Sequence, residues 1–257
     1  MDRRYSIGGG GKSSYSNSFS DFNCRNFINF CHAFCKKALA FTLAETLIVM
    51  GIIGVVAALT LPNLNSSTGD KEKVARVKKI YQNLNDAFGR ATAVYGPYNT
   101  WFINDTTLEQ KNKRFGERMT EFMKVSKSCG VNSGGCSANN YKYLYGENAP
   151  ALNDRNMYTF ILADGMNVGI NRPSIYVDID GANKGPNTFG KDVFAFYVVK
   201  SELGPYCYDA DDEEFFASFE ESNIIAGLCA SDWILRNENM DYLKCPLTLS
   251  WTNTTCK

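Results

Sequence analysis

Histidine is almost absent from this sequence: its 257 residues include one, His32, which lies near the N-terminus. Any site beyond residue 40 must therefore work without an imidazole. That excludes Ser-His-Asp and Cys-His nucleophile activation, and histidine-ligated zinc, from that part of the chain. Carboxylate catalysis stays open, but the usual acid–base group at neutral pH is missing. No nucleophile motif is present either, so the sequence predicts that the protein is not an enzyme.

The chain also lacks an excess of either charge, since Lys plus Arg and Asp plus Glu both number 27. The two signs are unevenly placed. Residues 1–40 carry six basic and two acidic residues, which leaves 21 basic against 25 acidic residues in the remainder. A slightly acidic remainder does not attract a polyanion at long range. The sequence thus gives no strong evidence for a nucleic-acid partner.

Apolar side chains are scarce in residues 1–35, which are rich in Gly, Ser and Asn. Such a stretch cannot offset its ordering entropy, so we predict that it is disordered. A long apolar run follows, and from Ala38 to Asp70 its only charge before the final aspartate is Glu45. Phe41–Leu61 spans 21 residues, enough for a helix to cross a hydrocarbon core of roughly 30 Å. Two lysines precede the run and predict a cytoplasmic N-terminus.

Glu45 is the exception within this apolar run. A carboxylate inside a membrane helix costs roughly 2.5–3.5 kcal/mol on insertion scales. Within its own chain we expect Glu45 to find no partner except a terminal amine, which cleavage before Phe41 would create. In a stack of identical helices, the glutamate of one subunit can face the amine of the next.

The segment AFTLAETLIVMGIIGVVAALTLP, residues 40–62, resembles the prepilin signal of type IV pilins and type II secretion pseudopilins. Ala40 stands before the cut, where glycine is commoner, and Phe41 and Glu45 occupy the first and fifth mature positions. Pro62 matches the family proline and is expected to kink or locally melt the helix. The resemblance implies cleavage between Ala40 and Phe41 by a prepilin peptidase, and N-methylation of Phe41.

The resemblance also implies an α+β, pilin-like fold. A long N-terminal helix, half membrane-spanning and half amphipathic, would pack on a small antiparallel β-sheet domain with disulfide-closed loops. Residues 1–40 would be a cleavable cytoplasmic leader and residues 41–65 the transmembrane or filament-core helix. Residues 66–257 would form the amphipathic helix and an exported globular domain.

The function implied is that of a structural subunit, major or minor, of a type IV pilus or type II secretion filament. The subunit would first span the bacterial inner membrane once and then enter an envelope or surface filament. Its partners would be prepilin peptidase, other pilin or pseudopilin subunits, the inner-membrane assembly platform and the membrane itself. The alternative is a membrane-anchored extracytoplasmic binding module or adhesin that does not polymerise.

The exported part has clear helix and strand patterns. From Lys71 onward an amphipathic stripe recurs every three or four residues and ends at Gly96-Pro97; it comprises Val74, Val77, Tyr81, Leu84, Phe88, Ala91 and Tyr95. A second helix is predicted over Leu108–Val125. Strands are predicted over Met157–Leu162, Met166–Ile170, Ser174–Ile179 and Val193–Val199. The turn Ala163-Asp164-Gly165 predicts a hairpin between the first two strands.

Six cysteines follow residue 41, an even number that suits up to three disulfides in an oxidising compartment. The alternative is six unpaired or partly buried thiols. Among the 15 pairings that six cysteines allow, proximity favours Cys129–Cys136 and Cys245–Cys256, which leaves Cys207–Cys229. The last loop also resembles the cystine-closed terminal region of many type IV pilins.

Residues 177–198, VDIDGANKGPNTFGKDVFAFYV, form the richest polar motif. Its five side-chain oxygen donors are Asp178, Asp180, Asn183, Asn187 and Asp192. Calcium takes about 6–8 oxygen ligands, so calcium is the one cofactor that the residues suggest, although the spacing is not that of an EF-hand. The favoured alternative is a connection rich in Asx turns, whose side chains cap backbone amides.

Overall fold

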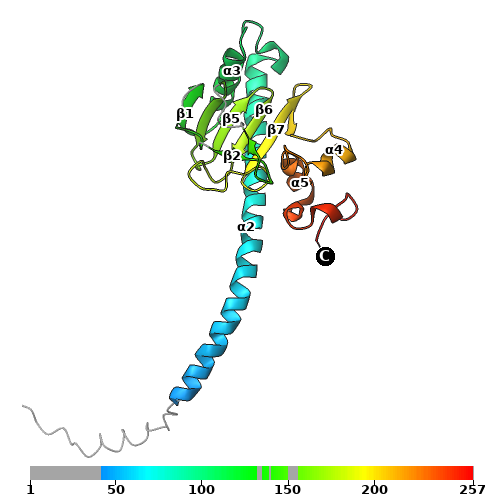
Figure 1. The fold of residues 1–257 in the computed structure, drawn as a ribbon. Helices are drawn as coiled ribbons and strands as arrows, with labels where there is room; N and C mark the ends of the chain where they lie inside the picture. The colour runs from blue at the N-terminus through cyan, green and yellow to red at the C-terminus, as the bar shows by residue number, and fades with distance from the viewer. Residues whose placement is uncertain (1–41, 132–134, 139, 150–155, 257) are drawn as a thin grey trace, which may run out of the picture. The chain divides into compact units, whose positions relative to one another are not determined.

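The computed structural model describes residues 42–131, 135–138, 140–149 and 156–256 (Figure 1). Within that range, side chains are not described at residue 57 or at residues 59–67. The chain divides into two compact units, residues 1–59 and residues 60–257, and each is considered by itself. The second unit is α+β, with a six-stranded antiparallel sheet and three disulfides.

Helix α2 runs from Leu43 to Tyr95 and has residues in both units. Of the two effects expected at Pro62, a kink or local melting, melting does not occur, because the chain stays helical from Leu43 to Tyr95. Proline removes only its own amide donor from the helix, so the turns on either side keep most of their hydrogen bonds.

The amphipathic stripe predicted in the later part of α2 is confirmed. Its side chains at Val77, Leu84 and Ala91 are fully buried, and the sequence pattern missed Ile80 and Ala87, which are buried equally. The stripe packs on the sheet: the Tyr81 ring stacks on Phe196 with 5.8 Å between ring centroids. Burial of large apolar side chains at this spacing stabilises the helix through tertiary packing rather than through helix propensity.

The main sheet has the strand order β1-β4-β5-β6-β7-β8, and every neighbouring pair is antiparallel. Its strands are β1 (Val125–Val131), β4 (Tyr158–Leu162), β5 (Asn167–Asn171), β6 (Ser174–Asp178), β7 (Val193–Val199) and β8 (Glu202–Pro205). Strands β2 (Tyr141–Lys142) and β3 (Asn148–Ala149) form a separate pair. The four predicted strands are therefore present, each within a residue or two of its expected ends.

Both faces of the sheet are covered, as the alternation along β7 shows. Phe194 and Phe196 belong to the large core that includes the stripe of α2. Val193 and Ala195 point to the other face and belong to a smaller core with Tyr141 and Phe189. Successive side chains of a strand point to opposite faces, so a strand that is apolar throughout must have packing on both sides.

The predicted helix Leu108–Val125 is too long. Helix α3 covers Leu108–Thr120, begins with a capping box between Thr107 and Gln110, and gives way to β1 at Val125. Sequence reasoning missed β1 because most of its side chains are exposed or half-buried and show no apolar alternation. Its partner is β4, some thirty residues away, and the register is broken in two places.

The C-terminal third adds short helices at the β8 edge of the sheet. They are α4 (Asp212–Ala217), α5 (Ala230–Asn237), η3 (Asp241–Leu243) and η4 (Pro246–Thr248); η1 (Tyr98–Thr100) follows α2. Helix α5 contacts β7 and β8, whereas α3 contacts β1, β4 and β5. The two helices therefore cover opposite ends of the strand order.

Gly116 allows α3 to approach β4, and its replacement tests this packing. A Cβ at Gly116 would lie 2.0 Å from Cδ1 of the Tyr158 ring. We expect Gly116→Ala to lower the free energy of unfolding by about 1–3 kcal/mol, since the ring must move out of a packed core. Thermal melting of the purified full-length chain measures this.

Gly89→Ala is the matched control, because a Cβ there meets nothing within 4 Å and the position lies inside α2. Alanine should stabilise that helix position by about 0.5–1 kcal/mol. Equal effects of the two substitutions would show that α3 does not pack on β4 through Gly116.

Candidate functional site

The described part of the predicted prepilin signal begins at Thr42, so Ala40 and Phe41 lie outside the described residues. At this helix start Thr42 and Glu45 form a reciprocal cap. The Glu45 carboxylate accepts the Thr42 backbone amide and hydroxyl, each at 2.9 Å, while the Glu45 amide donates to the Thr42 hydroxyl at 3.2 Å. This is the arrangement of a capping box, which satisfies amide donors that a helix start leaves unpaired.

The cap corrects one expectation. Glu45 was predicted to find no partner within its own chain except a terminal amine, but Thr42 supplies one three residues away. The expectation failed because it counted charged partners only and left out the amides of the helix start. A carboxylate has about four acceptor positions, so the cap leaves capacity for a further donor.

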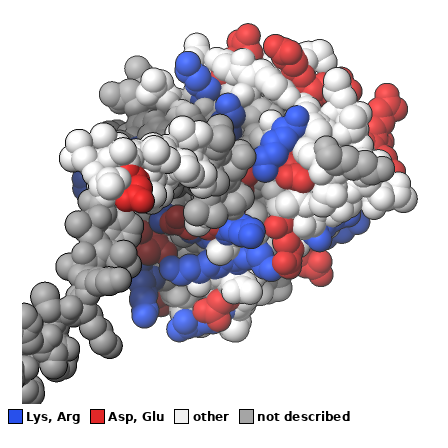
Figure 2. Space-filling model, turned by 90° about the horizontal axis from the view of Figure 1, so that it is seen from below, with Lys and Arg blue, Asp and Glu red and all other residues white. Residues whose placement is uncertain are grey.

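The residues after Glu45 present an apolar surface. Nine large hydrophobic side chains are exposed: Leu43, Leu47, Ile48, Val49, Met50, Ile52, Ile53, Val55 and Val56. Leu43 is 79% exposed and Met50 70%. Figure 2 shows this part of α2 with a largely uncharged surface. Within the described residues, no helix combines the length and apolarity needed to cross a membrane. The span predicted at Phe41–Leu61 includes residues outside that description and stays a prediction.

The second candidate site is the polar loop between β6 and β7. Asp192, just before β7, is buried and accepts the Asn187 amide at 2.7 Å and the Thr188 amide at 2.6 Å. Asn187 has a φ of 53°, in the left-handed region that asparagine tolerates. Gly181 has a φ of 92° and donates its amide to Asp178 at 2.9 Å. The loop is therefore held by carboxylates that cap its own backbone.

Asp178 is fully buried at the end of β6. Besides the Gly181 amide, its carboxyl group accepts the Tyr141 hydroxyl at 3.2 Å, and that hydroxyl also accepts the Asn167 side-chain amide at 3.4 Å. Burial, then the hydrogen-bonded carboxyl of Asp180 and the charge of Asp192, raises the pKa of Asp178 to about 7. Burial likewise raises the pKa of Asp192. Buried carboxyls this close to one another favour a bound proton.

The predicted calcium ligands are only partly brought together. Asp178, Asp180 and Asp192 interact, whereas the Asn183 side chain is exposed. Oδ1 of Asp180 is buried with no hydrogen-bond donor among the described residues. However, no group of three or more Asp, Glu, His or Cys side chains in the described part of the chain could hold a metal ion. The carboxylates of Asp178 and Asp192 accept backbone amides, as the Asx-turn alternative predicts.

Sequence reasoning missed the residues that enclose this loop from elsewhere in the chain. Tyr141 comes from β2, Asn167 from β5, and the buried Tyr242 of η3 donates its hydroxyl to the Gly190 carbonyl at 2.6 Å. No spacing in the sequence links these positions to residues 178–192. Their isolation in the sequence is the reason that the pattern of donors alone could not reveal them.

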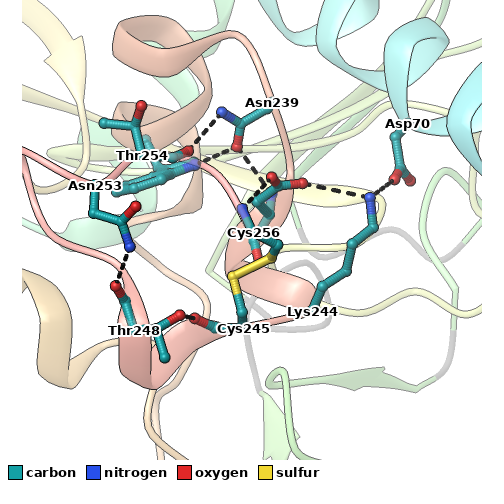
Figure 3. Close-up of a disulfide and its surroundings, with 10 residues drawn as sticks. Asp70, Asn239, Lys244, Cys245, Thr248, Asn253, Thr254 and Cys256 are labelled. Carbon is teal, nitrogen blue, oxygen red and sulfur yellow. Dashed lines mark hydrogen bonds and ion pairs between the residues drawn. A yellow bond between two sulfur atoms is a disulfide. The ribbon is translucent and has the colours of Figure 1, made fainter.

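The three predicted disulfides are confirmed: Cys129–Cys136, Cys207–Cys229 and Cys245–Cys256. Figure 3 shows the last of these and its surroundings. The Cys256 amide donates to Asp241 at 2.9 Å, and Asn239 donates to the Thr254 carbonyl at 3.0 Å. Lys244 pairs with Asp70 of α2 at 2.9 Å, so the closed C-terminal loop is fixed to the helix.

Asp178→Asn tests the protonated carboxyl. Folding raises the pKa of Asp178 from an ordinary value of about 3.9. The stability that the protonated carboxyl contributes is therefore complete below about pH 4 and is lost as the pH rises through about 7. We expect Asp178→Asn to match the parent protein near about pH 4 and to be more stable by about 1–3 kcal/mol at about pH 8. Thermal melts of both proteins between these two pH values measure the difference in stability. A difference that does not vary with pH would contradict a raised pKa of Asp178.

Melts in millimolar calcium and in millimolar magnesium are the accompanying control. We expect calcium and magnesium to have the same effect on the melting temperature, because the carboxylates of the loop accept backbone amides. A melting temperature that rises with calcium but not with magnesium, and no longer rises in Asp180→Ala, would instead establish calcium binding in this loop.

No protein-family model, no curated protein and no solved structure matches this chain. What can be said of its function therefore rests on its own residues and on the resemblance of residues 40–62 to a prepilin signal.

Proposed function

We propose that this protein is a structural subunit, a pilin or pseudopilin, of a type IV pilus or type II secretion filament, and that it is cleaved before Phe41. The observation that carries the proposal is the exposed apolar start of α2, with a single acid at Glu45. Its proposed partners are prepilin peptidase, the membrane, the inner-membrane assembly platform and other subunits of the same filament.

The exposed residues need an apolar environment. Complete burial of one large aliphatic side chain contributes about 1.5–3 kcal/mol, and nine such side chains are exposed over residues 43–56. A helix that is hydrophobic on all sides belongs in lipid or among other helices. A filament subunit uses both environments in turn: its helix is held in the membrane before assembly and packs against other helices afterwards.

The second unit supports an exported location. All six cysteines after residue 41 are paired. Disulfides form and persist in oxidising compartments and are rare in the cytosol. Since the lysines before Phe41 favour a cytoplasmic N-terminus, a helix that crosses the membrane once would place the disulfide-bonded unit outside the cytoplasm.

The capping box qualifies the role of Glu45. A plain membrane anchor also gains from a capped helix start, so the contact with Thr42 favours the alternative of a binding module that does not polymerise. A filament needs more from Glu45 than a cap: its charge must also face the amine of the neighbouring subunit. The two functions therefore differ in whether the negative charge of Glu45 is required.

The N-terminus of the protein extracted from the membranes of its host tests the proposal first. We expect Edman sequencing and intact mass to show a chain that starts at N-methylated Phe41, because prepilin peptidase both cleaves and methylates. A chain that retains residues 1–40, or is cut elsewhere, would contradict the proposed function and favour the anchored binding module.

Glu45→Gln separates the two roles of the side chain. Glutamine can accept the Thr42 amide as glutamate does, but it has no charge to pair with an amine. We expect Glu45→Gln to remain in the membrane at the parent level, while the yield of sheared filaments falls at least ten-fold. Glu45→Ala, which removes cap and charge together, is the comparison. Parent-level filaments from Glu45→Gln would show that capping is the only role of Glu45.

A further inference from the structure

An open groove of about 410 Å³ lies between α2, the segment that leads into β1, and the β4–β5 turn. Its apolar lining includes Phe122, Met123 and Leu162. Basic side chains of Lys79, Arg90 and Lys124 surround this lining. Below we call this feature the groove.

The groove carries more positive than negative charge. Lys79 pairs with Asp164 at 2.8 Å, and Arg90 pairs with Asp86 at 3.5 Å. Lys124 is exposed and forms no ion pair with any described residue. Three basic groups thus face two acids beside an apolar lining. A ligand that combines acidic and aliphatic groups would match both properties.

The chain itself contains such a ligand. Between α4 and α5, Glu220 and Glu221 are exposed, Ile224 is 71% exposed and Ile225 is 45% exposed. No basic residue occurs between Lys200 and Arg236, so nothing in the local sequence offsets these acids. Below we call residues 220–225 the knob.

The knob is held rigidly although its isoleucines are exposed. Asn223 accepts the Ile225 amide at 3.0 Å and donates to the Ala217 carbonyl at 3.1 Å. The Gly227 amide donates to the Ser218 carbonyl at 2.8 Å, and the Cys207–Cys229 disulfide closes the segment. A surface that is already ordered loses little conformational entropy when it binds.

The knob does not occupy the groove of its own molecule. The groove lies beside β1 and β4, at one end of the strand order. The knob immediately precedes α5, which packs on β7 and β8 at the other end. No residue of the knob lines the groove of its own molecule. The knob that fills a groove must therefore belong to another copy.

We propose that the knob of one copy binds in the groove of the next copy. Ile224 and Ile225 would pack on Phe122, Met123 and Leu162, while Glu220 and Glu221 would face Lys124 and Arg90. The two surfaces differ, so the contact is heterologous, and heterologous contacts that do not close into a ring produce helical filaments. This inference rests on the proposed filament function and adds a specific contact between the exported units.

Cysteine cross-linking in the filament-forming host tests the contact with the full-length chain. Asn83 is an exposed residue of α2 in the groove. We expect the double variant Ile224→Cys and Asn83→Cys, oxidised in intact cells, to give a ladder of species well beyond the dimer. Each single variant, once cleaved before Phe41, has one unpaired cysteine and can give a dimer at most. The matched control pairs Ile224→Cys with Ile103→Cys, which is 78% exposed outside the groove, and should give no ladder.

A charge exchange provides a second readout. Lys124→Glu added to the double-cysteine variant should reduce the ladder at least several-fold, and Glu221→Lys in the same chain should restore it. Assembled protein that starts at Phe41 but gives no ladder would overturn the knob–groove contact alone. Protein that is neither cleaved at Phe41 nor assembled, and gives no ladder, would overturn both the contact and the filament function.

Discussion

The second unit depends on one packing constraint, the burial of the apolar stripe of α2 against the sheet. Val77, Ile80 and Leu84 are fully buried, and Tyr81 stacks on Phe196. This contact fixes the rotation of the helix about its axis, because residues three and four apart share a face. The opposite face then carries Lys79, Asn83, Asp86 and Arg90, which form one wall of the groove. The core and the proposed contact surface thus follow from the same periodicity.

Earlier in the same helix the periodicity disappears. Residues 43–56 are apolar on all sides and exposed, and their only charge caps the helix start. Such a segment has no polar face to expose to water. All of its sides can therefore contact lipid or other helices. A helix whose amphipathic part packs on a sheet and whose apolar part is exposed is compatible with the proposed filament subunit.

The polar loop after β6 illustrates an ambiguity that is common in sequences rich in aspartate. Side-chain oxygens at close spacing suit either a cation or the loop's own amides, because both demand acceptors. Here Asp178 and Asp192 accept amides from Gly181, Asn187 and Thr188. The bond from Tyr242 to Gly190 then connects this loop to the disulfide-closed C-terminal loop, which Lys244 fixes to α2. The loop is best understood as a structural connection between β6, β7 and the C-terminal region.

Features that depend on near neighbours in the chain could be predicted from the amino-acid sequence. Periodicity, turn chemistry and short loops are local properties of the chain. They predicted the stripe of α2, the four central strands, the β4–β5 turn and the disulfides Cys129–Cys136 and Cys245–Cys256. Cys207–Cys229 followed by elimination. The resemblance of residues 40–62 to a prepilin signal is also local, and it supports the functional proposal.

Features that join distant segments follow from the tertiary structure alone. Strand β1 has no apolar alternation, since it is an edge strand whose pairing with β4 spans some thirty residues. The burial of Asp178 depends on Tyr141 and Asn167, which lie on other strands, so its raised pKa could not be inferred from the loop. The groove brings α2, the segment before β1 and the β4–β5 turn together, and this depends on packing that no single stretch of sequence contains.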